Sequence, residues 1–558
     1  MAKIHSLKIS NFRGIQEFDQ IFEDTDFICI IGRGDSGKTT ILEAISYVLS
    51  PSWNLSFLDT DFHNCNIKSP IEIEASIYDL PKGLIREDKY GLYIRGLDRT
   101  TNTVHDEIKD EHDTILTIKL CVERDLEPKW YVVNTRQEAI EIKARDRESL
   151  NVFLISDHVD KHFSWNYGSL LYSLLKQEDN GGDVKEKNVL IESLREAKVK
   201  IDDNSFGHLD AVIEKVKKNA SDLGIDIANT STTIDFRDFL IKDSKVCLHE
   251  EKVPFRLKGK GSKRLISIAI QTEHAKSGGI VLIDELEHGL EPDRAQHLAK
   301  TLKEGNLGQI FITTHSRDIL VELQAENLFL MRQEAVGLKR LNDALQGCIR
   351  NNPEAFFAKR ILVCEGATEV GICRALNDHR IQQGKDNATF KGIRFVDGGG
   401  ANLVKYSRNF KEAGYDVCAF CDSDESSLNS KKSALSEIGI RIIDCSLENS
   451  IEMQVFEDLP WDGVRKLILY RVSQKTEASV NSSVETQMGS LPNNWKDLDS
   501  VEMRKTLAKV STIEGNEWFK RIDHGMFLGE VCCQYLDDMR EEKLKQELNE
   551  LSTWIDNA

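Results

Sequence analysis

The sequence predicts an α/β protein with two successive units of strands and helices, a helical insertion in the first unit, and a small helical region at the C-terminal end. Three observations support this prediction. A short apolar run, Phe27–Ile31, is followed by a glycine-rich loop and then by an apolar helical pattern. Residues 165–245 are punctuated by many Lys and Glu between helical segments. A second series of apolar runs, which end at acidic residues, begins at Ile361.

The length and composition of the chain limit its class. Its 558 residues are too many for a single core, so several domains are expected. No stretch approaches the roughly 18 apolar residues of a membrane span, and the first residues lack the apolar core of a secretory signal. We therefore expect a cytoplasmic protein with no membrane partner. The net charge of −19 argues against a wholly basic DNA wrapper but permits a local basic groove.

The glycine-rich loop, Gly32–Thr39, fits the pattern G-x-x-x-x-G-K-[ST]. The strand before it and the helix after it are the context of a P-loop. Glycines let backbone N–H groups approach phosphate oxygens, and the helix N-terminus adds positive charge. We expect Lys38 to reach the β- and γ-phosphates of ATP and Thr39 to hold Mg²⁺. A chance match in an ordinary βα turn is the alternative. The residues expected to contact the nucleotide are Arg33, Gly34, Asp35, Ser36, Gly37, Lys38, Thr39 and Thr40.

Strand patterns surround the P-loop. Ile4–Ile9 alternates like an edge strand, and Asn11–Gly14 follows as a turn. We expect these runs to form an antiparallel subsheet beside the nucleotide. Further strand-like runs are Ile71–Ile77, Gly91–Ile94, Thr114–Val122 and Trp130–Val133.

The segment 165–245 has helical patterns at 189–199 and 209–223. We interpret it as an inserted helical arm. It can serve dimerisation, or it can be a solvated insertion without a partner, and the sequence favours neither.

Two later strands carry polar residues at their ends. Gly279–Ile283 is apolar and precedes Asp284 and Glu285, so a buried strand can deliver both acids to its carboxyl edge. There the aspartate can bind Mg²⁺ through water, and the glutamate can polarise the attacking water. The next strand begins at Gln309 and leads to His315, which can contact the γ-phosphate. The alternative is a strand that ends at an acidic turn.

Together with Asn11–Gly14 and Gly259–Arg264, these motifs resemble the ABC-type ATPases of the SMC and recombination-repair group. In that group the signature loop of one subunit completes the ATP site of another. The resemblance therefore implies a homodimer or higher homo-oligomer, with nucleotide contacts from Gly261 and Ser262. The group's glutamine has no clear match here, although Asp59–Phe62 lies near its expected place. The implied ATPase parts are residues 1–164 and 246–340, on either side of the insertion 165–245.

Acidic residues also follow two strands of the second unit. Glu365 and Glu369 come after one apolar run, and Asp422 and Asp424 come directly after another. Clustered carboxylates repel one another unless cations or protons neutralise them. Hard oxygen ligands suit Mg²⁺ or Mn²⁺, and two such ions can support phosphodiester cleavage. We expect the two pairs to converge; separate solvated turns are the alternative.

This half resembles a Toprim domain, and an ABC-type ATPase followed by Toprim resembles the OLD (overcoming lysogenization defect) nucleases over nearly the whole chain. The resemblance implies metal ligation by the four acids and by a later acid, with Asp397 a further candidate. It also implies that Lys520, in a Trp-Phe-Lys-Arg segment, offsets charge on the scissile phosphate; a surface lysine is the alternative. The implied metal ligands are Glu365, Glu369, Asp422, Asp424 and either Glu452 or Glu448, of which Glu452 is our choice.

The implied parts of this half are a linker helix at 341–358, a nuclease domain at 359–470 and a C-terminal helical region at 471–558, read as an amphipathic helix with a charged tail beyond Leu528. The implied function is an ATP-dependent, Mg²⁺- or Mn²⁺-dependent DNA endonuclease in phage defence, beside a partner protein or nucleic acid. One alternative is an ATP-driven sensor or scaffold that binds nucleic acid or a partner without cutting. A primase or topoisomerase is a third option, without a clear polymerising, zinc-binding or tyrosine context.

Overall fold

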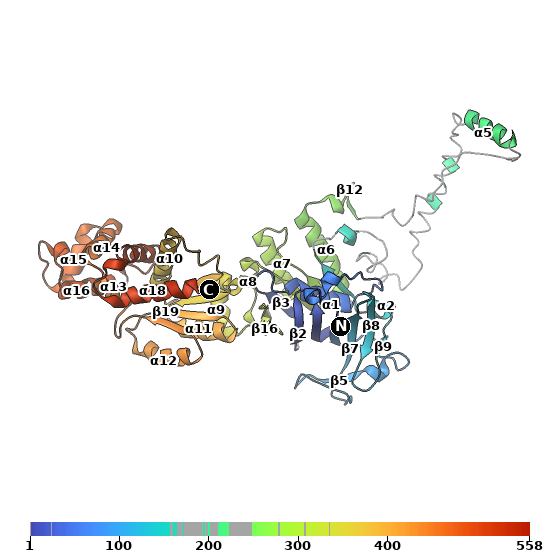
Figure 1. Ribbon diagram of the computed structural model, residues 1–558, viewed down its shortest axis with the longest axis horizontal. Helices are drawn as coiled ribbons and strands as arrows, with labels where there is room; N and C mark the ends of the chain where they lie inside the picture. The colour runs from blue at the N-terminus through green and yellow to red at the C-terminus, as the bar shows by residue number, and fades with distance from the viewer. Residues whose placement is uncertain are drawn as a thin grey trace. The chain divides into compact units, whose positions relative to one another are not determined.

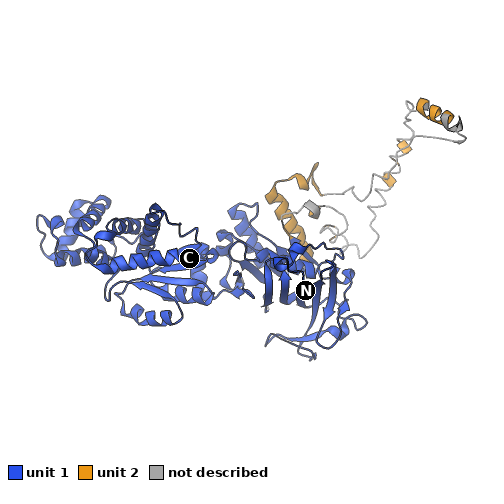
Figure 2. Cartoon of the chain, in the orientation of Figure 1, with its two compact units in different colours: residues 1–154, 278–558 blue, residues 155–277 orange. Residues whose placement is uncertain are grey.

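The computed structural model divides the chain into two compact units (Figure 2), residues 1–154 with 278–558 and residues 155–277. In the residues that the structure describes, the larger unit contains three sheets. The residues described are 2–23, 25–156, 160–163, 171, 174, 192–193, 196, 199–200, 210–222, 248–276, 279–305, 308–333 and 335–557.

The P-loop strand lies inside a six-stranded sheet of order β10-β13-β14-β3-β15-β16 (Figure 1). Its core strands run parallel, and every residue of β3, β13 and β14 is buried. Burial on both faces explains why these strands read as continuous apolar runs. Helix α1 starts at Lys38, directly after the loop. The bounds are β3 Phe27–Ile31, α1 Lys38–Val48, β10 Val152–Ile155, β13 Ile280–Ile283, α7 Pro292–Glu304, β14 Gln309–Thr313, α8 Arg317–Glu322, β15 Leu328–Leu330 and β16 Lys339–Arg340.

The expected antiparallel subsheet is confirmed as an eight-stranded sheet of order β2-β1-β4-β7-β5-β6, with β8 paired to β7 and β9 paired to β8. The prediction of a strand at Gly91–Ile94 is wrong, because Gly91–Tyr93 forms a 3-10 turn and the strand begins at Arg95. The backbone N–H of Tyr93 donates back to Tyr90, which closes this turn. The bounds are β1 Lys3–Phe12, β2 Ile15–Ile21, β4 Ile71–Tyr78, β5 Arg95–Asp98, β6 Thr103–His105, β7 Asp113–Val122, β8 Pro128–Val133 and β9 Ile140–Glu141.

The smaller unit contains the signature segment. Helix α6, Lys260–Ala275, begins after Gly259, so Gly261 and Ser262 lie in its first turn. The expected helical arm at 165–245 lies largely outside the described residues. Within it, α5 spans Asp210–Asp222.

The second half of the chain is built on a four-stranded parallel sheet of order β18-β17-β19-β20. Helices α11 and α12 lie on the opposite face of this sheet from α10 and α18 (Figure 1). Parallel strands place their carboxyl ends at one edge, which is where open α/β sheets bind their ligands. The bounds are β17 Arg360–Cys364, α10 Ala367–Gln382, β18 Ile393–Asp397, α11 Leu403–Glu412, β19 Asp416–Cys421, α12 Ser426–Glu437 and β20 Arg441–Asp444.

Helices α13–α18 complete this half. The amphipathic helix expected beyond Leu528 is confirmed as α18, which buries Leu544, Leu548 and Trp554, but the charged tail is wrong, because this helix extends to Asp556. The side chain of Asp556, at the end of α18, pairs with Arg380 and accepts from Lys385 Nζ at 2.8 Å. The bounds are α13 Ile451–Asp458, α14 Trp461–Gln474, α15 Glu477–Met488, α16 Val501–Ser511, α17 Ile522–Gln534 and α18 Glu542–Asp556.

Two glycine contacts join α10 and α17 closely. A Cβ on Gly371 would lie 2.4 Å from the carbonyl carbon of Gly525, and a Cβ on Gly529 would lie 2.8 Å from the Cα of Ile372. Only glycines permit this approach, which fixes the start of α17 against the start of α10.

The segment 341–358 is not one linker helix. A 3-10 turn (Asp343–Leu345), helix α9 (Gln346–Asn351) and a second 3-10 turn (Pro353–Phe357) follow one another, since Pro353 lacks the N–H that a continuing helix needs. No helix in the described part of the chain is long and apolar enough to cross a membrane.

Candidate nucleotide and metal sites

The P-loop has the backbone that phosphate binding needs. Gly37 has φ +96° and Asp35 has φ +60°, both in the left-handed region. A Cβ on Gly32 would lie 2.3 Å from the carbonyl oxygen of Met331, so only glycine fits there. The ammonium of Lys38 donates to the carbonyl oxygens of Gly32 (3.1 Å) and Arg33 (2.8 Å). Burial lowers the pKa of Lys38 to about 8, although the surrounding acids oppose this shift.

The two residues predicted to hold Mg²⁺ in the ATPase half are in contact. The hydroxyl of Thr39 lies 3.0 and 3.1 Å from the two carboxylate oxygens of Asp284. Thr313 on the neighbouring strand donates to Asp284 Oδ1 at 2.6 Å and fixes its orientation. One hydroxyl and one carboxylate side by side are oxygen ligands of the type that Mg²⁺ takes beside nucleotide phosphates.

Glu285 and His315 occupy the ends of β13 and β14. The backbone N–H of Glu285 donates to Thr313 Oγ1 at 2.7 Å, and Glu285 has φ +46°. Glu287, which sequence reasoning missed, accepts from the Thr314 hydroxyl and from the backbone N–H of His315, both at 2.6 Å. Burial, and then the charge of Lys38, lower the pKa of His315. The Asp-Glu-Leu-Glu spacing was the available signal for Glu287.

The other predicted nucleotide contacts fall into two groups. Gly34, Asp35 and Ser36 lie on the loop, and Thr40 lies in the first turn of α1. Gly261 and Ser262 belong to the smaller unit. The Ser36 hydroxyl accepts from Lys38 Nζ at 3.4 Å, a long contact.

The segment near the expected glutamine is tied to the N-terminal turn. Asp61 lies in a 3-10 turn and accepts from Arg13 Nε at 2.8 Å. The backbone N–H of Arg13 donates to the carbonyl oxygen of Asp61 at 2.7 Å. These contacts explain why Asn11–Gly14 forms its turn here, and they occupy Asp61 with an ion pair.

The structure brings the predicted acids of the second half together. Glu365 follows β17, Asp422 follows the adjacent β19, and the backbone N–H of Asp422 donates to Glu365 Oε2 at 2.9 Å. Glu369 accepts from the backbone N–H of Gly366 at 2.8 Å. Asp422 Oδ1 accepts from the backbone N–H of Ile451 at 2.7 Å, which places the first turn of α13, with Glu452, beside it.

The electrostatics reflect this convergence. Burial, and then the charges of Glu369, Glu452, Glu365 and Asp424, raise the pKa of Asp422 to about 9. Burial, then the charge of Glu452, raise the pKa of Glu369 to about 8. Burial is also the first cause of the raised pKa values of Glu365 and Glu452. Such carboxylates are either neutral or require a cation close by.

Of the two alternatives for the later acid, Glu452 lies in this cluster. Its side chain is 5% exposed, and its charge raises the pKa values of Glu369 and Asp422. Glu448 is exposed and has φ +68°. Asp397 ends β18 and accepts from the backbone N–H of Gly399 at 2.7 Å, one strand away from Glu365.

Lys520 is exposed, and its positive charge partly opposes the rise in the pKa of Glu452 that burial causes. The hydroxyl of Thr368 on α10 donates to the carbonyl oxygen of Phe519 at 3.2 Å and holds this segment. A second lysine was missed. Lys432 Nζ donates to the Asp422 carbonyl (2.7 Å), the Ser423 hydroxyl (2.8 Å) and Asp444 (2.9 Å). No motif marks it in the sequence.

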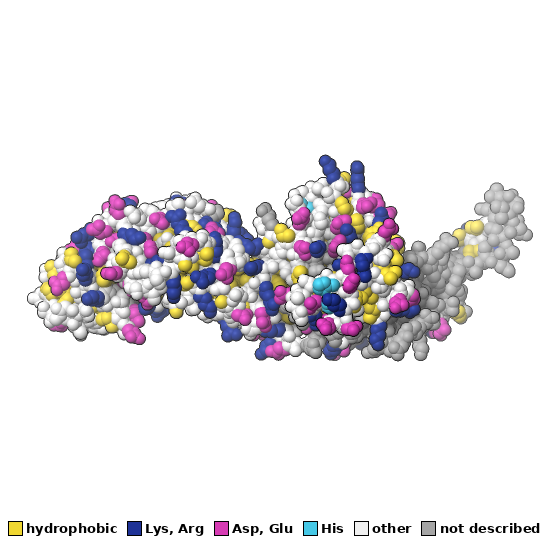
Figure 3. Space-filling view, turned by 90° about the horizontal axis from the view of Figure 1, so that it is seen from below, with side chains coloured by type: hydrophobic (Ala, Val, Ile, Leu, Met, Phe, Trp, Pro, Cys, Tyr) yellow, Lys and Arg dark blue, Asp and Glu magenta, His cyan; other side chains and the backbone are white. Residues whose placement is uncertain are grey.

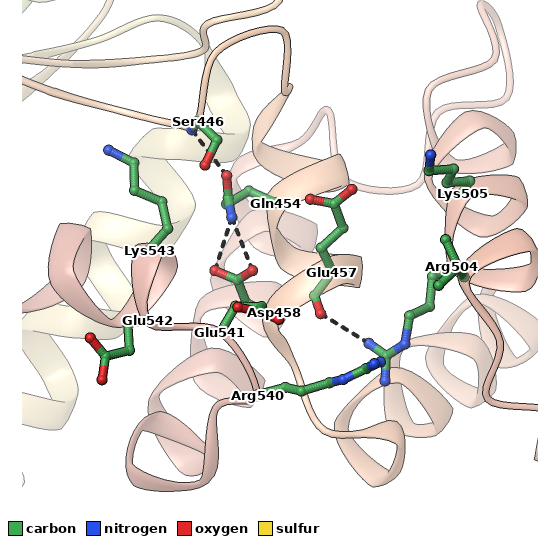
Figure 4. Close-up of a pocket in the computed structure, with 11 residues that line it drawn as sticks. Ser446, Gln454, Glu457, Asp458, Arg504, Lys505, Arg540, Glu541, Glu542 and Lys543 are labelled. Carbon is green, nitrogen blue, oxygen red and sulfur yellow. Dashed lines mark hydrogen bonds between the residues drawn. The ribbon is translucent and has the colours of Figure 1, made fainter.

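A pocket of about 360 Å³ lies on α13 beyond this cluster and involves none of the predicted site residues (Figure 4). Gln454 Nε2 donates to both carboxylate oxygens of Asp458, at 3.0 and 2.9 Å. Arg504 Nη1 donates to the carbonyl oxygen of Glu457 at 3.3 Å. Arg504 thus joins α16 to α13, and Asp458, which accepts from the backbone N–H of Leu544 at 2.7 Å, joins α13 to α18.

Comparisons with known proteins identify both halves. The family model of the AAA ATPase domain matches residues 2–320. The model described as overcoming lysogenization defect protein-like, TOPRIM domain, matches residues 356–424. No curated protein matches the chain.

Solved structures also match. One is the Smc head domain from Pyrococcus furiosus with an extended coiled coil, bound to the C-terminal domain of ScpA: 15% identity, 63% of this chain, 98% of that chain, TM-score 0.35. Another is the SmcHead bound to the C-winged helix domain of ScpA: 16% identity, 61% of this chain, 97% of that chain, TM-score 0.34. The predicted fold class, an ATPase domain followed by a Toprim domain and C-terminal helices, is confirmed by the family models. The chain belongs to the AAA ATPase domain family and, with its OLD-like TOPRIM domain, is an OLD family protein.

Proposed function

We propose that the protein is an ATP-dependent, divalent-metal-dependent DNA endonuclease. The observation that carries this proposal is the convergence of Glu365, Glu369, Asp422 and Glu452 at one edge of a parallel sheet, where burial and mutual repulsion raise their pKa values. The OLD-like TOPRIM match supports an interaction with nucleic acid at this edge.

The donor set fits Mg²⁺ or Mn²⁺, because it consists of carboxylate oxygens. Their negative charges repel one another, and a bound cation would neutralise them. Bound ions of this kind activate water and stabilise the leaving oxygen of a phosphodiester. Glu365, Glu369, Asp422 and Glu452 are the proposed ligands, with the exposed Asp424 as a further acid. Lys520 would offset charge that develops on the scissile phosphate.

The ATPase half has the groups for nucleotide hydrolysis. Lys38 and the loop N–H groups would bind the phosphates, and Thr39 and Asp284 would hold the Mg²⁺ of the nucleotide. Glu285 would orient water, while His315, which Glu287 anchors, would face the γ-phosphate. Gly261 and Ser262 of a second copy would complete the site in a homodimer or higher homo-oligomer, so that ATP binding changes the oligomer that presents DNA to the nuclease edge.

The test is cleavage of supercoiled, linear and single-stranded DNA with Mg²⁺ or Mn²⁺, with and without ATP. The double variant Asp422→Ala/Asp424→Ala should lose cleavage, and the exposed Glu448→Ala should keep it. Undiminished nicking by the double variant would reject these acids as its source. ATP hydrolysis without cleavage of any of the substrates would favour the sensor or scaffold function instead.

A role in phage defence, beside a partner protein or nucleic acid, is the biological part of the proposal, and the OLD family membership supports it. Cells that express the wild type should reduce phage plating, and cells that express Asp422→Ala/Asp424→Ala should not. Equal phage plating on the two kinds of cells would reject a role of the nuclease edge in defence. It would not bear on DNA cleavage, which the assay above tests separately.

A further inference from the structure

Two histidines and an aspartate meet at the far end of the antiparallel N-terminal sheet. Asp98 ends β5, His105 ends β6, and His112 directly precedes β7. One ligand atom from each lies within 4.8 Å of those of the other two. The two imidazole rings are stacked, with centroids 5.1 Å apart and planes at 18°.

The strand register explains this meeting. In the β5–β6 hairpin, Asp98 lies opposite Thr103 and Gly96 lies opposite His105. Residues two apart in a strand share a face, so the side chains of Asp98 and His105 emerge on the same face of the hairpin. This group is far in sequence from the acids of the second half. It also differs from those acids in its donors, because His105 and His112 offer ring nitrogens.

Neighbouring residues fit the sheet around this group. A Cβ on Gly96 would lie 2.5 Å from His112 Nδ1, so the missing side chain leaves the room that the imidazole occupies. Asp98 Oδ1 accepts from the backbone N–H (2.8 Å) and the hydroxyl (2.6 Å) of Thr100. These hydrogen bonds lower the pKa of Asp98 to about 2, so the carboxylate is charged at neutral pH. His105 Nε2 lies 2.9 Å from the Thr103 hydroxyl.

The surroundings favour a cation. The loop between β6 and β7 carries Asp106, Glu107, Asp110 and Glu111. On the face seen in Figure 3, histidine side chains lie among acidic and basic ones at the surface, open to solvent. Acidic side chains around an open site raise the local concentration of cations.

We propose that Asp98, His105 and His112 bind a borderline divalent cation, Zn²⁺ in the first place, with water as the fourth ligand. Two imidazole nitrogens and one carboxylate oxygen suit Zn²⁺, whereas Mg²⁺ prefers oxygen ligands alone. Zn²⁺ holds such ligands about 2.0–2.2 Å away, so the donors of one site lie up to about 4 Å apart. Rotation of the three side chains would close the remaining gap when the ion binds. The bound ion would tie the β5–β6 turn to the β6–β7 loop.

Little free energy is lost when the hydrogen bond at His112 is replaced by a bond to a metal ion. Its Nδ1 accepts from the backbone N–H of Lys109 at 3.4 Å, which is long for a hydrogen bond. A change of tautomer that frees the other ring nitrogen for the ion therefore loses little.

The test is calorimetric titration of the full-length protein with Zn²⁺ in excess Mg²⁺, which occupies the oxygen-rich sites. Wild type should bind one equivalent more than His105→Ala/His112→Ala. His297→Ala, a control at an exposed histidine of α7, should match wild type. Thr100→Ala, which removes the hydroxyl that orients Asp98, should weaken binding about tenfold. Equal stoichiometry in wild type and the double variant would overturn the proposal.

A second measurement uses the unmodified protein, so that a misfolded variant cannot decide the outcome. One equivalent of Cu²⁺ should give an electron paramagnetic resonance spectrum with coupling to two nitrogens, and Zn²⁺ should displace it. A spectrum of oxygen ligation alone would overturn the proposal. The proposed nuclease activity is independent of this result, because the double histidine variant leaves Glu365 and Asp422 in place.

Discussion

The backbone N–H of Asp422 donates to Glu365 Oε2 at 2.9 Å, across 57 residues of sequence. This hydrogen bond joins the carboxyl ends of two adjacent parallel strands, β17 and β19. Each of these acidic turns is ordinary by itself. The hydrogen bond between them brings their carboxylates together at one edge of the sheet. The first two predictions concern this edge.

Replacing Glu365 by Gln should show whether cleavage depends on the negative charge of this side chain or only on its hydrogen bond to Asp422. The amide oxygen can still accept from the backbone N–H of Asp422, so the fold should be kept, with a thermal midpoint near that of wild type. Because an anionic ligand is lost, metal-dependent cleavage should fall by about 10- to 100-fold or more. Glu365→Ala should lose cleavage and also the hydrogen bond. Cleavage rates over a range of Mn²⁺ concentrations, with differential scanning calorimetry, distinguish the two variants; wild-type cleavage by Glu365→Gln would contradict the assignment.

Without metal, stability should decrease as the pH rises. The pKa values of Asp422 and Glu369 are raised in the folded protein to about 9 and about 8, above the ordinary values of about 4 for these groups. Their protonated forms therefore stabilise the fold fully below about pH 4, and this stabilisation is lost as the pH passes through about 8 to 9. Urea unfolding at pH 6 and pH 9 in EDTA measures the loss.

Bound Mg²⁺ or Mn²⁺ takes over the role of these protons, so the same comparison with metal should show a smaller loss. Asp422→Asn should also reduce the pH dependence, since its amide does not titrate. An equal pH dependence in wild type with and without metal would contradict a cation site at this edge.

Glu287 should matter for ATP hydrolysis. Glu287→Ala removes the acceptor for the Thr314 hydroxyl and the His315 N–H, each at 2.6 Å. Loss of these charge-assisted bonds should lower kcat by about 10- to 100-fold with a smaller change in KM, because His315 loses its position. Glu287→Gln keeps an acceptor and should recover part of the rate. A steady-state ATPase assay decides, and an unchanged kcat in Glu287→Ala would show that His315 does not depend on this residue.

Lys38→Ala should abolish ATP binding. The ammonium is held inside the P-loop by the carbonyl oxygens of Gly32 and Arg33, and a neutral side chain cannot attract phosphate. Fluorescence titration with a labelled ATP analogue should show affinity lowered at least tenfold, and the effect of ATP on DNA cleavage should disappear. Lys300→Ala, at an exposed position of α7, is the matched control. If cleavage by Lys38→Ala still responded to ATP, the P-loop would not be the site through which ATP controls the nuclease.

The contact between α10 and α17 should be intolerant of one methyl group. A Cβ on Gly371 meets backbone atoms of Gly525 at 2.4 Å, so Gly371→Ala should destabilise the protein by about 1–3 kcal/mol. Because α17 follows Lys520, the same substitution should also reduce cleavage. Gly83→Ala, where a Cβ meets nothing within 4 Å, is the control. Thermal unfolding of the two variants tests this contact.

Short-range patterns predicted much of this molecule. The P-loop, the strand before Asp284 and the strands before Glu365 and Asp422 are local signals, and parallel pairing brings their ends together. Residues without a local motif were missed. Glu287 and Lys432 act by holding neighbouring backbone, and their partners lie on other strands or turns. Asp98, His105 and His112 belong to no local motif, and they meet only because β5 pairs with both β6 and β7.

The C-terminal region shows the same limit. Its apolar positions suggest an amphipathic helix, but which surface that helix covers depends on contacts with α10 and the parallel sheet. Gly91–Ile94 was mistaken for a strand because its apolar residues also suit a 3-10 turn, which the hydrogen bond from Tyr93 to Tyr90 closes.

The attachment of α18 has a practical consequence for protein engineering. Asp556 is bound by Arg380 and Lys385, and Arg360 Nη1 donates to the carbonyl oxygen of Trp554 at 2.8 Å, so the last turn of the helix is anchored to the first strand and first helix of the Toprim domain. An affinity tag fused directly after this turn, or a shortened expression clone, would therefore perturb the domain that contains the carboxylates. Purification handles belong on a spacer or at the other end of the polypeptide.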